Sequence, residues 1–88
     1  MNFVLAERYG LKILIIENRS TGENWALYAH MYTWGFIDSR PSFAELDGMK
    51  LKVIPSKEAI ETLKKFALDS VMGHRVSKFL EQYEALPF

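Results

Sequence analysis

Two histidines, His30 and His74, are the side chains in this 88-residue sequence best suited to act as a general base near neutral pH. His30 lies in an aromatic stretch, where Asp38 or Glu17 could orient its ring. A histidine outside any catalytic motif is more often a hydrogen-bonded structural residue, and the same reasoning applies to His74, which follows Gly73 at a helix junction. We therefore predict no catalytic residue and no enzymatic activity.

The sequence contains no recognisable motif for a metal ion or a cofactor. It has no cysteine, no HExxH sequence, no Walker loop and no dinucleotide-binding glycine loop. Carboxylates lie three residues apart at Glu58 and Glu61, and again at Glu81 and Glu84, and such pairs could share a metal. Lysines interspersed with these glutamates are more typical of the solvated face of an amphipathic helix. We predict no metal site and no cofactor.

The absence of cysteine also bears on the compartment. Small extracellular domains usually need disulfides, so a chain without cysteine is expected in the cytoplasm. Eleven Lys and Arg residues balance eleven Asp and Glu residues, so no net charge favours nucleic acid or a membrane surface. No stretch approaches the roughly 20 apolar residues of a membrane span.

The elements that must position any site follow from the apolar pattern. Because 49% of the residues are hydrophobic, the chain can build a core, and its length suits one domain over residues 1–88. Strand patterns come first and helix patterns last. This order predicts an α+β fold in which a small antiparallel sheet of three to five strands, in the N-terminal two-thirds, is covered on one face by one or two C-terminal helices.

Individual segments support that fold. Residues 11–16, LKILII, are apolar on both faces and predict a central strand. Asp47-Gly48 predicts a hairpin that joins a strand at 42–46 to another at 49–54, in which apolar core residues alternate with lysines. Helices are expected at about 56–72 and 75–85, and Gly73 either separates two helices or bends one.

Residues 25–36, WALYAHMYTWGF, fit two structures. As a helix, the segment would begin with a capping box at Ser20 and Glu23 and end at Gly35. As a strand, it would place Tyr28, His30, Tyr32 and Trp34 on one face. Its aromatic content and the short polar loop before it favour the strand.

These aromatic residues suggest a function. A sheet with helices on one side exposes its other side to water or to a partner, and exposed aromatic rings suit a protein interface. We therefore expect a non-enzymatic protein-interaction module: an adaptor, an assembly subunit or an inhibitor, including one encoded by a phage or another mobile element. A homodimer is the simplest way to cover such a face. An ordinary core closed by the same rings fits the sequence equally well. The expected partner-binding residues are Tyr28, Tyr32, Trp34, Phe36 and Arg40.

An alternative function is the binding of single-stranded nucleic acid. Small β-rich domains bind single strands by stacking bases on aromatic rings beside a positive groove. In this interpretation the same aromatic residues stack the bases, and the phosphates contact a lysine patch made of Lys50, Lys52, Lys57, Lys64 and Lys65.

Overall fold

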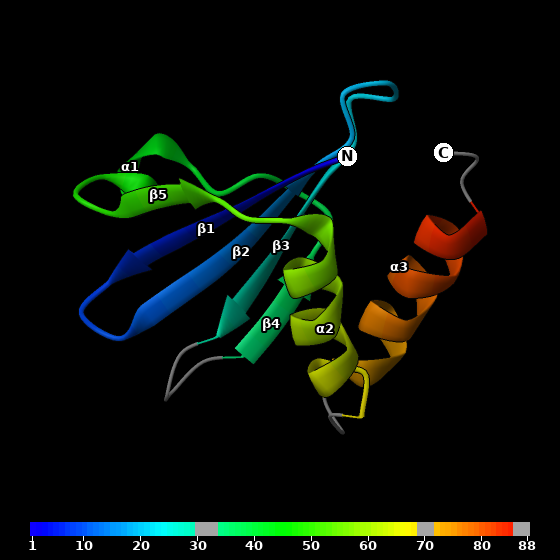
Figure 1. Cartoon of the computed structure of the whole chain (residues 1–88). Coiled ribbons are helices and arrows are strands. Elements are labelled where there is room, and N and C mark those ends of the chain that lie inside the picture. The colour runs from blue at the N-terminus through cyan, green and yellow to red at the C-terminus, as the bar shows by residue number, and fades with distance from the viewer. Residues whose placement is uncertain (30–33, 69–71, 86–88) are drawn as a thin grey trace.

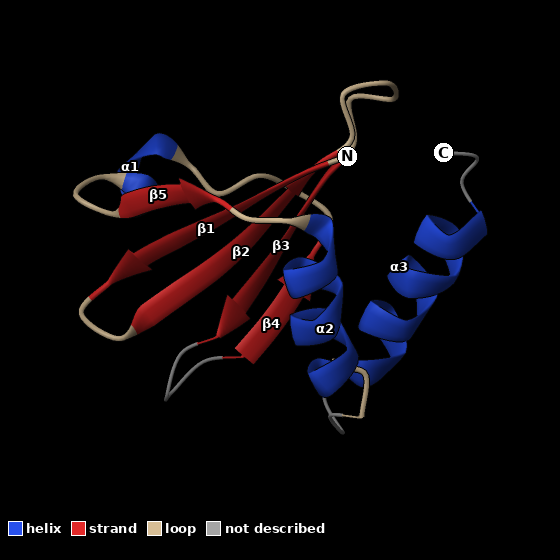
Figure 2. Cartoon of the chain, viewed as in Figure 1, coloured by secondary structure: helices blue, strands red, loops and turns tan. Residues whose placement is uncertain are grey.

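The computed structural model describes residues 1–29, 34–68 and 72–85 of the chain. A five-stranded antiparallel sheet is followed by two C-terminal helices, which confirms the predicted α+β fold (Figure 1). Figure 2 shows both helices on the same side of the sheet. The elements in chain order are β1 (Asn2–Arg8), β2 (Leu11–Glu17), β3 (Asn24–Ala29), β4 (Trp34–Ile37), α1 (Phe43–Leu46), β5 (Lys50–Val53), α2 (Ser56–Phe66) and α3 (Gly73–Ala85).

The strand order across the sheet is β4-β3-β2-β1-β5, which places the apolar strand β2 in the centre. Its residues 13–16 are all buried, so the predicted central strand is confirmed. A two-residue turn joins β1 to β2. Both of its residues have positive φ angles, 47° at Tyr9 and 84° at Gly10, as a type I′ hairpin turn requires.

The described parts of residues 25–36 lie in two strands rather than the single strand that was favoured. β3 and β4 pair antiparallel, with Ala26 opposite Ile37, and residues 30–33 between them lie outside the described part. The reason is the length of the neighbouring strand. β2 has only seven residues, so the second half of a continuous twelve-residue strand would leave its backbone without a partner. With two strands, β3 pairs with β2 and β4 pairs with β3, so the backbone of each strand has a partner.

The predicted strand at 42–46 is wrong, because this segment begins helix α1. The Ser42 hydroxyl accepts a hydrogen bond from the Glu45 N–H at 3.2 Å, and the Glu45 carboxylate accepts one from the Ser42 N–H at 3.0 Å. This capping box stabilises a helical turn locally. Asp47-Gly48 still forms a turn, with φ 75° at Gly48, but it leads from α1 into β5, which pairs with β1 instead.

The main core lies between the sheet and the two C-terminal helices. Trp25 and Phe36 from the sheet meet Phe79 of α3, with ring centroids 5.0 Å and 5.8 Å apart. Gly73 separates two helices and is the first residue of α3. A Cβ atom at this position would lie 2.5 Å from the carbonyl oxygen of Ala67, so only glycine permits this approach to the end of α2.

The second face of the sheet is covered by the chain itself. β4 and β5 are the two edges of the sheet, so the connection between them, residues 38–49, has to cross it. It crosses on the face opposite the helices, where its Leu46 and Met49 pack on a second cluster that includes Ile13 and Ile15. Both isoleucines are 1% exposed. This covering segment, residues 38–49, thus packs on the face of the sheet that we expected to contact water or a partner.

Candidate functional site

The aromatic residues expected to bind a partner do not share one face. Phe36 is 2% exposed and belongs to the core under the helices. Tyr28 lies on the opposite face, in the cluster under the covering segment, where its hydroxyl donates to Glu45 of α1 at 3.1 Å. Burial raises the pKa of Tyr28 to about 12, and the hydrogen bond and negative charge of Glu45 act in the same direction. The expectation of a single aromatic face is therefore wrong for the described rings.

The remaining predicted partner-binding residues give no common surface either. Arg40 is in the covering segment, and its guanidinium forms an ion pair with Glu17 of β2, with Nη1 and Oε1 2.7 Å apart. The backbone of Trp34 pairs with Ala29 in the sheet. Tyr32 and His30 lie outside the described residues. Arg40 thus links the covering segment to the sheet, and its role as a partner anchor stays a prediction.

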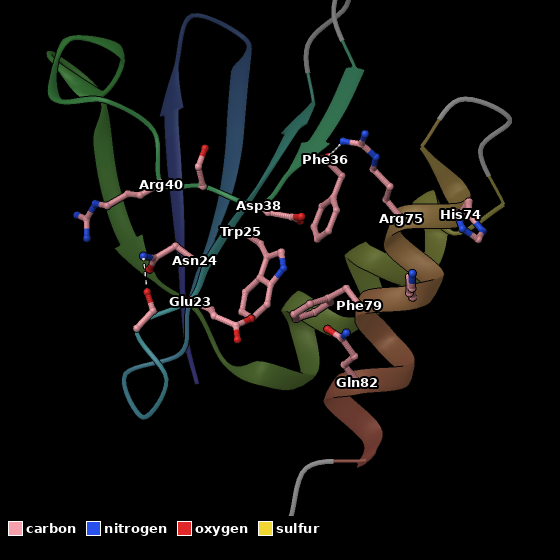
Figure 3. A pocket seen from close by; sticks show the side chains of 13 residues that line it. Glu23, Asn24, Trp25, Phe36, Asp38, Arg40, His74, Arg75, Phe79 and Gln82 are labelled. Carbon is pink, nitrogen blue, oxygen red and sulfur yellow. Dashed lines mark hydrogen bonds between the residues drawn. The ribbon is translucent and has the colours of Figure 1, made fainter.

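A groove of about 750 Å³ opens between the sheet and α3 (Figure 3). Its floor consists of Trp25, Phe36 and Phe79, which are too buried to offer much ring surface. Arg75 at its rim already donates to the carbonyl oxygen of Phe36 at 3.3 Å. Within the described part of the chain, no hydrogen bond joins His74, also at the rim, to a carboxylate. The groove therefore lacks a base held by an acidic partner.

The five lysines proposed to contact nucleic acid are all exposed but are spread over two elements. Two of them are on β5 and the other three are distributed along α2, from its first turn to its last (Lys50 and Lys52; Lys57, Lys64 and Lys65). Of the aromatic rings that were expected to stack bases beside them, Phe36 is buried under the helices and Tyr28 packs under the covering segment. Lysines and stacking rings are therefore not brought together among the described residues.

β5 is the element whose exposure the sequence did not reveal. Leu51 and Val53 are 56% and 75% exposed, although the alternation with lysine predicted that they face the core. Opposite them on β1 are Ala6 and Val4, which belong to the second cluster. The two apolar side chains therefore lie on the face of the covering segment, beyond the area that it buries. The strand order places β5 at the edge of the sheet.

The backbone of β5 also offers free hydrogen-bonding groups. The N–H of Ile54 donates to the carbonyl oxygen of Phe3 at 3.0 Å, which continues the β1–β5 ladder. Bonded and non-bonded pairs alternate in an antiparallel ladder, so the two lysines of β5 bond to β1 as Ile54 does. The N–H and C=O groups of Leu51 and Val53 therefore point to the open edge. No other residue in the described ranges donates to or accepts from them.

The two edges of the sheet differ in this respect. At the β4 edge, the Arg75 side chain from α3 bonds to the Phe36 carbonyl. No such side-chain contact is present at β5 among the described residues. Natural edge strands are commonly protected by charge, by proline or by a covering element. β5 has charge alone, from its two lysines. We define the open edge as residues 50–53 of β5, and it is the candidate functional site.

The chain matches no protein-family model, no curated protein and no solved structure. Over the described residues, no group of three or more His, Cys, Asp or Glu side chains is placed to hold a metal ion. No helix in the same ranges has the length and apolar character needed to cross a membrane. The geometry of the open edge is therefore the basis for a functional proposal.

Proposed function

We propose that this protein is a non-enzymatic protein-interaction module that binds a partner by adding a strand of that partner to the open edge. The observation that carries the proposal is the double exposure of Leu51 and Val53, which present both apolar side chains and outward backbone groups. Strand addition uses both at once, because the backbone bonds give affinity and alternate side chains give specificity.

The expected affinity is modest. Burying the exposed parts of Leu51 and Val53 contributes roughly 1–2 kcal/mol each. Four outward backbone groups add about 0.5–1.5 kcal/mol per hydrogen bond. Ordering the partner strand and losing rigid-body freedom offset much of this sum. Contacts beyond β5 are therefore needed, and Phe43 on α1, which is 90% exposed and precedes β5 by only a few residues, is the natural extension of the interface.

Three variants test the proposal through capture of partner proteins from extracts of the native host. Leu51→Ser removes an exposed apolar side chain at the open edge, and Leu68→Ser removes an equally apolar one far from it, where Leu68 is 91% exposed. Leu51→Pro also removes the outward N–H without breaking the β1 ladder. We expect Leu68→Ser to capture the partner as the wild type does, Leu51→Ser to capture less of it and Leu51→Pro to capture none.

The same captured complex identifies the interface directly. Hydrogen exchange should slow at the amides of Leu51 and Val53 when the partner is bound. A folded Leu51→Pro variant that retains the partner at the level of the wild type would contradict strand addition at this edge. If nuclease releases the captured material, single-stranded nucleic-acid binding is favoured instead, since a nuclease does not cleave a protein partner.

Two finer expectations accompany the proposal. A cytoplasmic location follows from the lack of cysteine in the sequence. The homodimer was expected in order to cover the second face of the sheet, and the covering segment removes that reason because it buries the centre of that face. We therefore propose a different protein, rather than a second copy, as the partner.

A further inference from the structure

The two faces of the open edge carry different chemistry. Leu51 and Val53 lie on the face of the covering segment, whereas Lys50 and Lys52 lie on the face of the helices, opposite Glu7 and Leu5 of β1. Neither lysine forms an ion pair with a described residue. A strand added at this edge would place its own side chains beside two lysines on one face, of which Lys50 also has Glu7 opposite it on β1, and beside two apolar side chains on the other face.

A second copy of the chain fits this edge poorly. Opposite residues of an antiparallel pair have side chains on the same face. In a symmetric β5–β5 pair, one register places Lys52 opposite the Lys52 of the other copy. The other central register places Lys50 opposite Lys52 twice. Like charges directly opposite are destabilising, so both registers are disfavoured.

The surroundings of Lys50 extend the positive charge beyond β5. A shallow cavity of about 450 Å³ at the β1–β2 turn is bordered by Lys50, Arg8 and Lys12, with Glu7 as its one carboxylate. Arg8 also donates to the carbonyl oxygen of Asp47 at 3.1 Å, which holds its cation near the start of β5. A segment that continues past Lys50 along the edge would therefore also meet the Arg8 cation, beside the exposed Asp47.

We propose that the open edge binds an extended segment of another protein in which acidic side chains alternate with apolar ones. The acidic residues lie opposite Lys50 and Lys52, and the apolar residues lie opposite Leu51 and Val53. Opposite charges across a strand pair stabilise it, and aliphatic pairs on the other face do the same. This inference rests on the proposed strand addition and specifies the partner's sequence chemistry.

The test uses four end-capped eight-residue peptides and the isotope-labelled protein. Three peptides alternate valine with glutamate, glutamine or lysine, and the fourth has the glutamates and valines in separate blocks. Backbone amide shifts of Leu51 and Val53 report binding at the edge. We expect the alternating glutamate peptide to bind about tenfold more tightly than the glutamine peptide. The lysine and block peptides should bind more weakly still.

The variant Lys50→Glu/Lys52→Glu should reverse this preference in favour of the lysine peptide, and added salt should reduce it in both proteins. Equal binding of the glutamate and glutamine peptides at the edge would overturn the acidic partner but leave strand addition intact. If none of the four peptides shifts the amides of Leu51 and Val53, strand addition is overturned as well. The two proposals are thus separated by one titration.

Discussion

The hydrogen bond between Tyr28 and Glu45 links the covering segment to the sheet, and Tyr28→Phe removes it without changing the ring. The bond is 3.1 Å long. Glu45 keeps its second partner, the Ser42 N–H, so its carboxylate is not left unbonded in the variant. At pH 7 we therefore expect the free energy of unfolding to fall by about 1 kcal/mol, the usual contribution of one such bond.

The effect of pH follows from the raised pKa of the Tyr28 phenol. It moves from 10.0 to about 12 on folding, so the protein favours the neutral phenol. This stability is fully present below pH 10 and is lost as the pH rises through 12. Two pKa units correspond to at most about 2.7 kcal/mol, and contact of the ring edge with water reduces this to about 1–2 kcal/mol. The advantage of the wild type over Tyr28→Phe should shrink to zero or reverse near pH 11–12.

The measurement is urea unfolding of the wild type and of Tyr28→Phe from pH 7 to pH 12. The difference between their free energies of unfolding is compared at each pH, so that the contributions of other titrating groups cancel. Tyr9→Phe is the matched control, because the Tyr9 ring is 95% exposed and accepts no hydrogen bond from a described residue. It should follow the wild type at every pH. A Tyr28→Phe curve that runs parallel to the wild type throughout would refute the reasoning, because it would mean that folding does not depend on the protonation of Tyr28.

Three further predictions concern the core and two backbone positions. Phe36→Ala should cost about 3–5 kcal/mol and lower the melting temperature by calorimetry, as expected for a core residue; a loss of partner binding at unchanged stability would make Phe36 an interface residue instead. Gly73→Ala should destabilise by roughly 1–3 kcal/mol, because its Cβ would lie 2.5 Å from the Ala67 carbonyl oxygen; an unchanged denaturation midpoint would show that α2 and α3 can separate freely. Tyr9→Asn should stabilise by about 0.5–1 kcal/mol, since asparagine tolerates the φ of 47° better, even though the stacking of Arg8 on the ring, 5.4 Å from its centroid, is lost; a lower melting temperature would show that this stacking outweighs the backbone strain.

Local patterns were sufficient for the elements that bury one continuous apolar surface. Residues 13–16 are apolar at every position, as expected of a strand covered on both faces, and β2 is such a strand. The helical spacing after Pro55 likewise led to α2 and α3. The strand predicted at 42–46 is wrong because that prediction rested on the Asp47-Gly48 turn alone, whereas the capping box of Ser42 and Glu45 stabilises a helical turn. That signal was visible in the sequence.

The site could not be predicted in the same way. The alternation of lysine with apolar residues at 50–53 indicates that the two faces of the strand differ. Whether either face is buried depends on which elements lie over it. The order β4-β3-β2-β1-β5 makes β5 an edge and requires residues 38–49 to cross the sheet. The amino-acid sequence thus determined the central strand and the two C-terminal helices. Non-local strand pairing decided which apolar residues stay exposed, because burial comes from neighbours distant in the chain.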